Sequence, residues 1–135
     1  MATQRDREVH LAENGSLNGG YVRFGRSVQT TDATATVLLS IPLAEGEAVS
    51  GRAIITGSQD DETDALGAVV EFAARRASAG NVTLVGTAAR NILESTANTD
   101  ITVAANTTDQ VFEIRVTGIA AENWRWEGFV DFVKV

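Results

Sequence analysis

The side chains that could take part in catalysis are few and lie far apart in this sequence. His10 is the only histidine, and a hydrolytic triad would need it held beside a nucleophile and a carboxylate. Few large apolar residues surround it, so a solvated histidine is the favoured interpretation. The chain contains no cysteine, which excludes thiolate catalysis, thiolate metal sites and disulfides.

Carboxylates offer two further kinds of chemistry. Glu113, Glu127 and Asp131 could supply the pair of acids that hydrolyses a glycosidic bond, but each alternates with core residues and should face solvent or another subunit. The run from Asp60 to Asp64 could bind calcium, although it lacks the spacing of a calcium-binding loop, and a solvated hairpin tip is favoured. No phosphate-binding glycine motif occurs. We therefore predict no catalytic residue, no cofactor, no metal site and no enzymatic activity.

Two tryptophans, Trp124 and Trp126, could stack on sugar rings. They share a parity with Val130 and Phe132, however, and strict alternation of this kind is typical of a strand with one buried face. Placement in the core is therefore favoured. Arg125 points to the opposite side and is a candidate for a cross-strand or intersubunit ion pair.

The elements that would carry these residues are predicted to be strands. Alternating apolar and polar residues cover segments 21–28, 35–41, 49–57, 82–85 and 101–105, followed by two long strands joined around Gly118. Segment 66–79 has helix start and stop signals, but the paired Val69 and Val70 and the return through Val82 favour a β-hairpin. Segment 91–99 is predicted to be a helical turn or a loop.

A chain of 135 residues fits one domain, and frequent turn formers between short strands are typical of an all-β fold. We predict an antiparallel, jelly-roll-like β-sandwich over residues 21–135, preceded by an extended N-terminal arm over residues 1–20. The arm is either a disordered terminus or a segment that lies on a neighbouring subunit.

The strand faces opposite the predicted core are not uniformly polar. Leu38, Ile54, Val111, Phe129 and Val133 have the outward parity. A monomeric sandwich would normally place polar residues there, so subunit contacts are the simplest explanation. Loops that cover the face, or a bulge that shifts the register, are the alternatives.

Charge limits the choice of partners. There are 11 Lys and Arg residues against 18 Asp and Glu residues, which gives a net charge of -7. Phosphate binding needs clustered basic residues, so no nucleic acid is expected as a partner. The apolar runs are short and interrupted, so no membrane span is expected either.

Several short motifs resemble those of a β-sandwich module found in virion proteins of tailed phages. They are Thr31-Asp32-Ala33-Thr34, Arg75-Arg76, Val116-Thr117-Gly118 and Trp126, and the similarity covers Thr30 to Val135. The resemblance implies a virion component that is assembled in the host cytoplasm and is usually trimeric or otherwise symmetric. It also implies a strand rather than a helix over segment 66–79, and it transfers no catalytic residue.

The function predicted on this basis is that of a phage head decoration (cement) protein, which would bind the major capsid protein or other virion proteins. The alternative is a tail-fibre or tail-tip module that binds a host receptor or carbohydrate through loops such as 60–64 and 91–99. The predicted contact residues are Arg5, Arg7, Val9, Leu11, Arg125, Phe129 and Val133.

Overall fold

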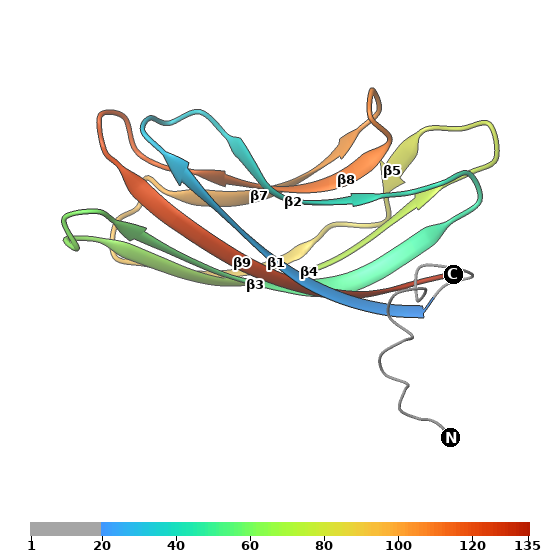
Figure 1. Cartoon of the computed structure of the whole chain (residues 1–135), viewed down its shortest axis with the longest axis horizontal. Helices are drawn as coiled ribbons and strands as arrows, with labels where there is room; N and C mark the ends of the chain where they lie inside the picture. The colour runs from blue at the N-terminus through green and yellow to red at the C-terminus, as the bar shows by residue number, and fades with distance from the viewer. Residues whose placement is uncertain (1–19) are drawn as a thin grey trace, which may run out of the picture.

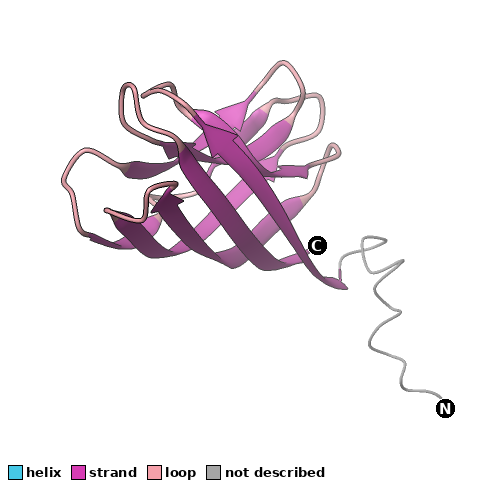
Figure 2. Cartoon of the chain, turned by 60° about the vertical axis from the view of Figure 1, so that its left-hand side comes forward, coloured by secondary structure: helices cyan, strands magenta, loops and turns pink. Residues whose placement is uncertain are grey.

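The computed structural model describes residues 20–135, and within them every regular element is a β-strand (Figures 1 and 2). The strands are β1 (Gly20–Thr30), β2 (Thr36–Pro42), β3 (Ala48–Gln59), β4 (Ala65–Arg76), β5 (Val82–Leu84), β6 (Ala89–Glu94), β7 (Asp100–Asn106), β8 (Val111–Thr117) and β9 (Trp124–Lys134). They form two antiparallel sheets packed face to face. The predicted all-β sandwich is confirmed.

The larger sheet has the order β1-β9-β3-β4-β5, with β6 also paired to β4, and the smaller sheet has the order β2-β8-β7. The pair β1 and β9 in one layer is continued by the pair β2 and β8 in the other, as in a jelly roll. The β3–β4 hairpin, in contrast, remains inside the larger sheet. The connectivity is therefore only partly that of a jelly roll.

The core lies between the two sheets and is built from residues of one parity. Trp124, Trp126, Val130 and Phe132 are all at most 5% exposed, as the alternation in β9 predicts. The two indole rings stack with centroids 5.4 Å apart, and Trp126 Nε1 donates a hydrogen bond to Thr30 Oγ1 at 3.0 Å. This bond satisfies the polar atom of a buried tryptophan, which would otherwise make its burial costly.

Segment 66–79 forms strand β4 and the turn that follows it, as the hairpin interpretation predicts. Leu66, Val70 and Phe72 point into the core, and the Phe72 ring stacks on Phe112 of the other sheet with centroids 4.3 Å apart. Packing across the sandwich therefore overrides the helix signals of this alanine-rich segment.

One predicted orientation is wrong. Leu38 was expected to face outward, but it is 5% exposed, while Val37 is 40% exposed. The pairing of β2 with β8 slips between Val37 and Leu39, and this bulge turns both leucines inward. Gly128 of β9 leaves space for the Leu38 side chain, since a Cβ at position 128 would lie 2.7 Å from Leu38 Cδ2.

Two further features of the fold differ from the prediction or add to it. Part of segment 91–99 is strand β6 rather than a helical turn or a loop. The strands on either side of Gly118 are both present, but β8 belongs to the smaller sheet and β9 to the larger. The segment around Gly118 therefore crosses from one layer to the other.

Some predictions fall on residues 1–19, outside the described part of the chain. These are most of the N-terminal arm, His10, and the contact residues Arg5, Arg7, Val9 and Leu11. Within residues 20–135, no helix is long and apolar enough to cross a membrane.

Candidate functional site

The outer face of the larger sheet is organised in rows, because directly opposed residues of antiparallel strands point to the same side. We name five such rows, each of which runs across β1, β9, β3 and β4. The edge row is Tyr21, Val133, Ser50 and Ala73; the charged row is Arg23, Asp131, Arg52 and Glu71; the apolar row is Gly25, Phe129, Ile54 and Val69; the two polar rows are Ser27, Glu127, Thr56 and Gly67, then Gln29, Arg125, Ser58 and Ala65.

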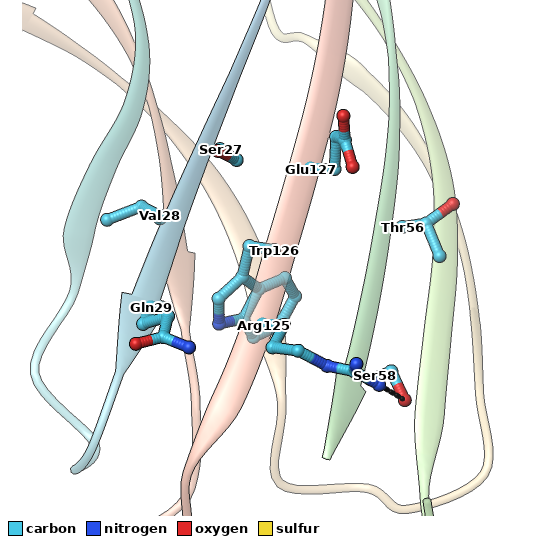
Figure 3. A pocket seen from close by; sticks show the side chains of 8 residues that line it. All are labelled: Ser27, Val28, Gln29, Thr56, Ser58, Arg125, Trp126 and Glu127. Atoms are coloured by element: carbon cyan, nitrogen blue, oxygen red, sulfur yellow. Dashed lines mark hydrogen bonds between the residues drawn. The ribbon is translucent and has the colours of Figure 1, made fainter. Parts of the chain in front are cut away.

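The β1, β9 and β3 members of the two polar rows line an open groove of about 560 Å³. Three neighbouring strands contribute to it, and Figure 3 shows their side chains around the opening. The lining residues are Ser27, Val28 and Gln29 of β1, Thr56 and Ser58 of β3, and Arg125, Trp126 and Glu127 of β9. The volume falls within the range of small-molecule binding sites.

Arg125 is held at one end of this groove by contacts within the chain. Its Nε lies 3.4 Å from Asp60 Oδ1. Its Nη2 donates a hydrogen bond to Ser58 Oγ at 3.4 Å, which Figure 3 shows. About half of its side chain remains exposed. Because a guanidinium has five N–H donors, Arg125 can still donate to a ligand while these contacts persist.

The groove offers hydrogen-bond donors and acceptors of several kinds. Gln29 supplies an amide, Glu127 a carboxylate, and Ser27 and Thr56 supply hydroxyls. No aromatic ring is exposed in it, since Trp126 is 1% exposed. Such a lining suits a ligand rich in hydroxyl or carboxylate groups.

Three of the predicted contact residues lie together on the outer face of β9. Arg125 belongs to the second polar row, Phe129 to the apolar row and Val133 to the edge row. Phe129 is half-buried and Val133 is 49% exposed. Their contact with another protein stays a prediction.

The predicted carboxylates do not form one site. Glu113 lies on the outer face of the smaller sheet, whereas Glu127 and Asp131 lie on the outer face of the larger one. Glu113 Oε1 accepts a hydrogen bond from Arg115 Nη2 at 2.6 Å, and its Oε2 accepts one from Asn106 Nδ2 at 2.9 Å. Burial by itself raises the pKa of Glu113, but these two hydrogen bonds and the Arg115 charge outweigh it, so the pKa is lowered.

The acidic segment 60–64 forms the tip of the β3–β4 hairpin, as expected for that run. Asp60 pairs with Arg125, Asp61 Oδ1 accepts a hydrogen bond from the Thr63 backbone N–H, and Asp64 Oδ1 accepts one from Ser95 Oγ. Throughout residues 20–135, no group of three or more His, Cys, Asp or Glu residues could hold a metal ion.

The groove residues of β1 and β3 were missed by the sequence analysis. Ser27, Gln29, Thr56 and Ser58 are uncharged polar residues at outward positions, which any solvated strand carries. The only signal that could have pointed to them is the pairing register, which brings these distant segments beside Arg125.

No family model and no curated protein matches this chain. Three similar solved structures are tailspike proteins of Acinetobacter phages, from Acinetobacter baumannii phage AM24 (TM-score 0.45, 7% identity), from Acinetobacter baumannii bacteriophage Fri1 (0.40, 13%) and from Acinetobacter phage vB_ApiP_P1 (0.32, 20%). The matches cover 89%, 84% and 77% of this chain but only 27%, 18% and 21% of the tailspikes. All three TM-scores lie below 0.5, so the superpositions do not place the chain in a family.

The comparison corrects one prediction. The sequence was interpreted as that of a protein without enzymatic activity, yet the matched Fri1 protein, gp49, is a capsular polysaccharide depolymerase. The prediction is therefore wrong as it was drawn. Its physical basis was too narrow: the lack of cysteine and of a placed histidine excludes only reactions that need those groups, and hydrolysis of a glycosidic bond can rely on carboxylates alone.

Proposed function

We propose that this chain is a virion module of a phage tail fibre or tailspike, and that it binds carbohydrate in the groove on the outer face of its larger sheet. The observation that carries the proposal is the groove itself, in which two rows of polar side chains from β1, β9 and β3 line about 560 Å³. The resemblance of Thr30 to Val135 to tailed-phage virion modules supplies the biological setting.

The chemistry of the groove supports a saccharide ligand. Sugar hydroxyls both donate and accept hydrogen bonds, and the groove pairs acceptors such as Glu127 with donors such as Arg125 and Gln29. Arg125 would also attract an acidic sugar, because its guanidinium can form charge-assisted hydrogen bonds with a carboxylate.

The groove also favours the tail assignment over the head decoration role. A cement protein needs an adhesive surface but no polar groove, whereas a host-recognition module needs a place for a soluble or surface polymer. Strand-borne side chains suit such a site, since a packed sheet holds them more rigidly than the flanking loops would.

The test is binding of the full chain to a glycan array and to purified capsular polysaccharides, followed by titration calorimetry on the best ligand. The double variant Gln29→Ala/Arg125→Ala should weaken binding at least about tenfold, because it removes a neutral and a charge-assisted hydrogen bond. Ser40→Ala, which removes an exposed hydroxyl from the outer face of the smaller sheet, is the matched control and should leave affinity unchanged.

Release of reducing ends in the same mixtures tests whether bound polysaccharide is cleaved. An array without any ligand, or equal affinities for the wild type and the groove variant, would overturn the proposal.

A further inference from the structure

Apolar side chains are exposed mainly on the outer face of the larger sheet. Of the nine large apolar residues exposed within residues 20–135, Tyr21, Ile54, Val69, Leu93 and Val133 lie on this face. Their exposed fractions run from 37% for Val69 to 69% for Leu93. Tyr21 and Val133 are neighbours in the edge row, and Ile54 and Val69 are neighbours in the apolar row. Exposed apolar residues gathered on one face favour an interaction site over a solvated face.

Charges beside the apolar row alternate from strand to strand. Across the sheet, the charged row has the order Arg23, Asp131, Arg52 and Glu71, which is plus, minus, plus, minus. No ion pair within residues 20–135 joins two members of this row. The Asp131 carboxylate accepts a hydrogen bond from the Tyr21 hydroxyl at 3.3 Å, and the Arg23 guanidinium lies 4.8 Å from the centre of the Phe129 ring.

When the charged row is reversed, every position carries the opposite charge. The row is therefore complementary to a reversed copy of itself. A two-fold axis along the strands, between β9 and β3, places a second copy on the face with its row reversed. Arg23 then faces Glu71 of the other copy, and Asp131 faces Arg52. All four positions meet an opposite charge, and in the apolar row Phe129 meets Ile54.

Another orientation of the same face does not fit. A two-fold axis along the charged row would place each residue opposite its own copy, so that arginine faces arginine and carboxylate faces carboxylate. Like charges facing each other across an interface cost several kcal/mol. The pattern therefore selects one geometry of contact between two identical chains.

The area available for contact is at the lower limit for a specific pair. The edge, charged and apolar rows extend about 20 Å along five strands that lie about 4.8 Å apart, which gives roughly 500 Å² per copy and about 1,000 Å² in total. The strands bend toward the smaller sheet at the end where β9 begins (Figure 1). The polar rows therefore curve away from a partner docked on the charged and apolar rows.

We infer that the charged and apolar rows dock a second copy of this chain in an isologous, face-to-face dimer. The interface is independent of carbohydrate binding, but both grooves come to lie at the same end of the dimer. The self-complementary charges specify the partner. In the apolar row, Ile54 of each copy contacts Phe129 of the other beside the two-fold axis.

Two charge reversals test this geometry. Position 52 of each copy faces position 131 of the other. A dimer of the Arg52→Asp variant would therefore contain two facing pairs of carboxylates, and a dimer of the Asp131→Arg variant two facing pairs of guanidiniums. Each variant should weaken self-association on the order of 100-fold. An equimolar mixture of the two variants restores an opposite charge at all four positions, so a heterodimer should form.

Sedimentation velocity of the full chain, in the high micromolar range, measures the outcome. The wild type is expected as a dimer, each variant as a monomer, and the mixture as a dimer. Thr102→Asp, on the outer face of the smaller sheet, is the control and should remain dimeric. Circular dichroism checks that every variant is folded.

Three results would overturn the inference. They are a monomeric wild type, a wild-type oligomer such as a trimer that is unaffected by both reversals, and a mixture of the two variants that stays monomeric. Loss of glycan binding in the groove variant with an intact dimer would bear on the proposed function alone.

Discussion

The outer faces of the two sheets differ in how their charged side chains are hydrogen-bonded and exposed. On the smaller sheet, Glu113 is 5% exposed, and its carboxylate accepts hydrogen bonds from both Arg115 and Asn106. On the larger sheet, the charged row is solvated and lies beside exposed apolar residues such as Ile54. Polar groups that are satisfied within the chain need no partner, whereas unmatched charges next to apolar surface do. The proposed face-to-face dimer would account for this difference, because it supplies the charges of the larger sheet with partners from a second copy.

The strongest test of this comparison is removal of one carboxylate from each face. Glu113→Ala should lower the free energy of unfolding by about 2–3 kcal/mol, because it leaves the half-buried Arg115 without its partner. Glu127→Ala on the larger sheet should change it by less than about 0.5 kcal/mol, as expected for an exposed residue. Urea denaturation of both variants measures the difference. Equal losses would contradict the contrast between the faces.

Acidification should destabilise the protein through protonation of Glu113 on the smaller sheet. The pKa of Glu113 is lowered in the folded chain below the ordinary value of 4.5, so the unfolded chain binds its proton first as the pH falls. The stability that this carboxylate contributes is therefore fully present above about pH 4.5 and is lost as the pH falls through the folded pKa. Thermal unfolding between pH 3 and pH 6, roughly the range in which carboxylates titrate, should show a shallower loss of stability in Glu113→Gln than in the wild type. A loss of the same steepness in both would contradict the assignment.

Only a small effect is expected at the exposed ion pair of the larger sheet. Arg125→Ala removes the contact with Asp60, which is open to solvent, and should cost about 0.2–1 kcal/mol. At about 1 M salt the difference should vanish, because the screening length falls to about 3 Å. Urea denaturation at low and high salt checks this. A cost that persists at high salt would show that Arg125 is held as firmly as Arg115.

Part of the site could be predicted from the sequence. The alternation in β9 places Arg125, Phe129 and Val133 on one face, because the direction of a side chain in a strand depends only on its position in a period of two. The same local rule places Trp124 and Trp126 in the core. It fails at Leu38, where a bulge that depends on the partner strand changes the parity.

The amino-acid sequence by itself determined the class of fold, most of the strands and the buried residues of β9, since these follow from local alternation and turn formers. Only the tertiary structure decided that β8 and β9 lie in different sheets, that segments 27–29, 56–58 and 125–127 share one groove, and that the charges of four strands align in one row. These features depend on which strands pair and in which register, and that choice is made by contacts between residues far apart in the chain.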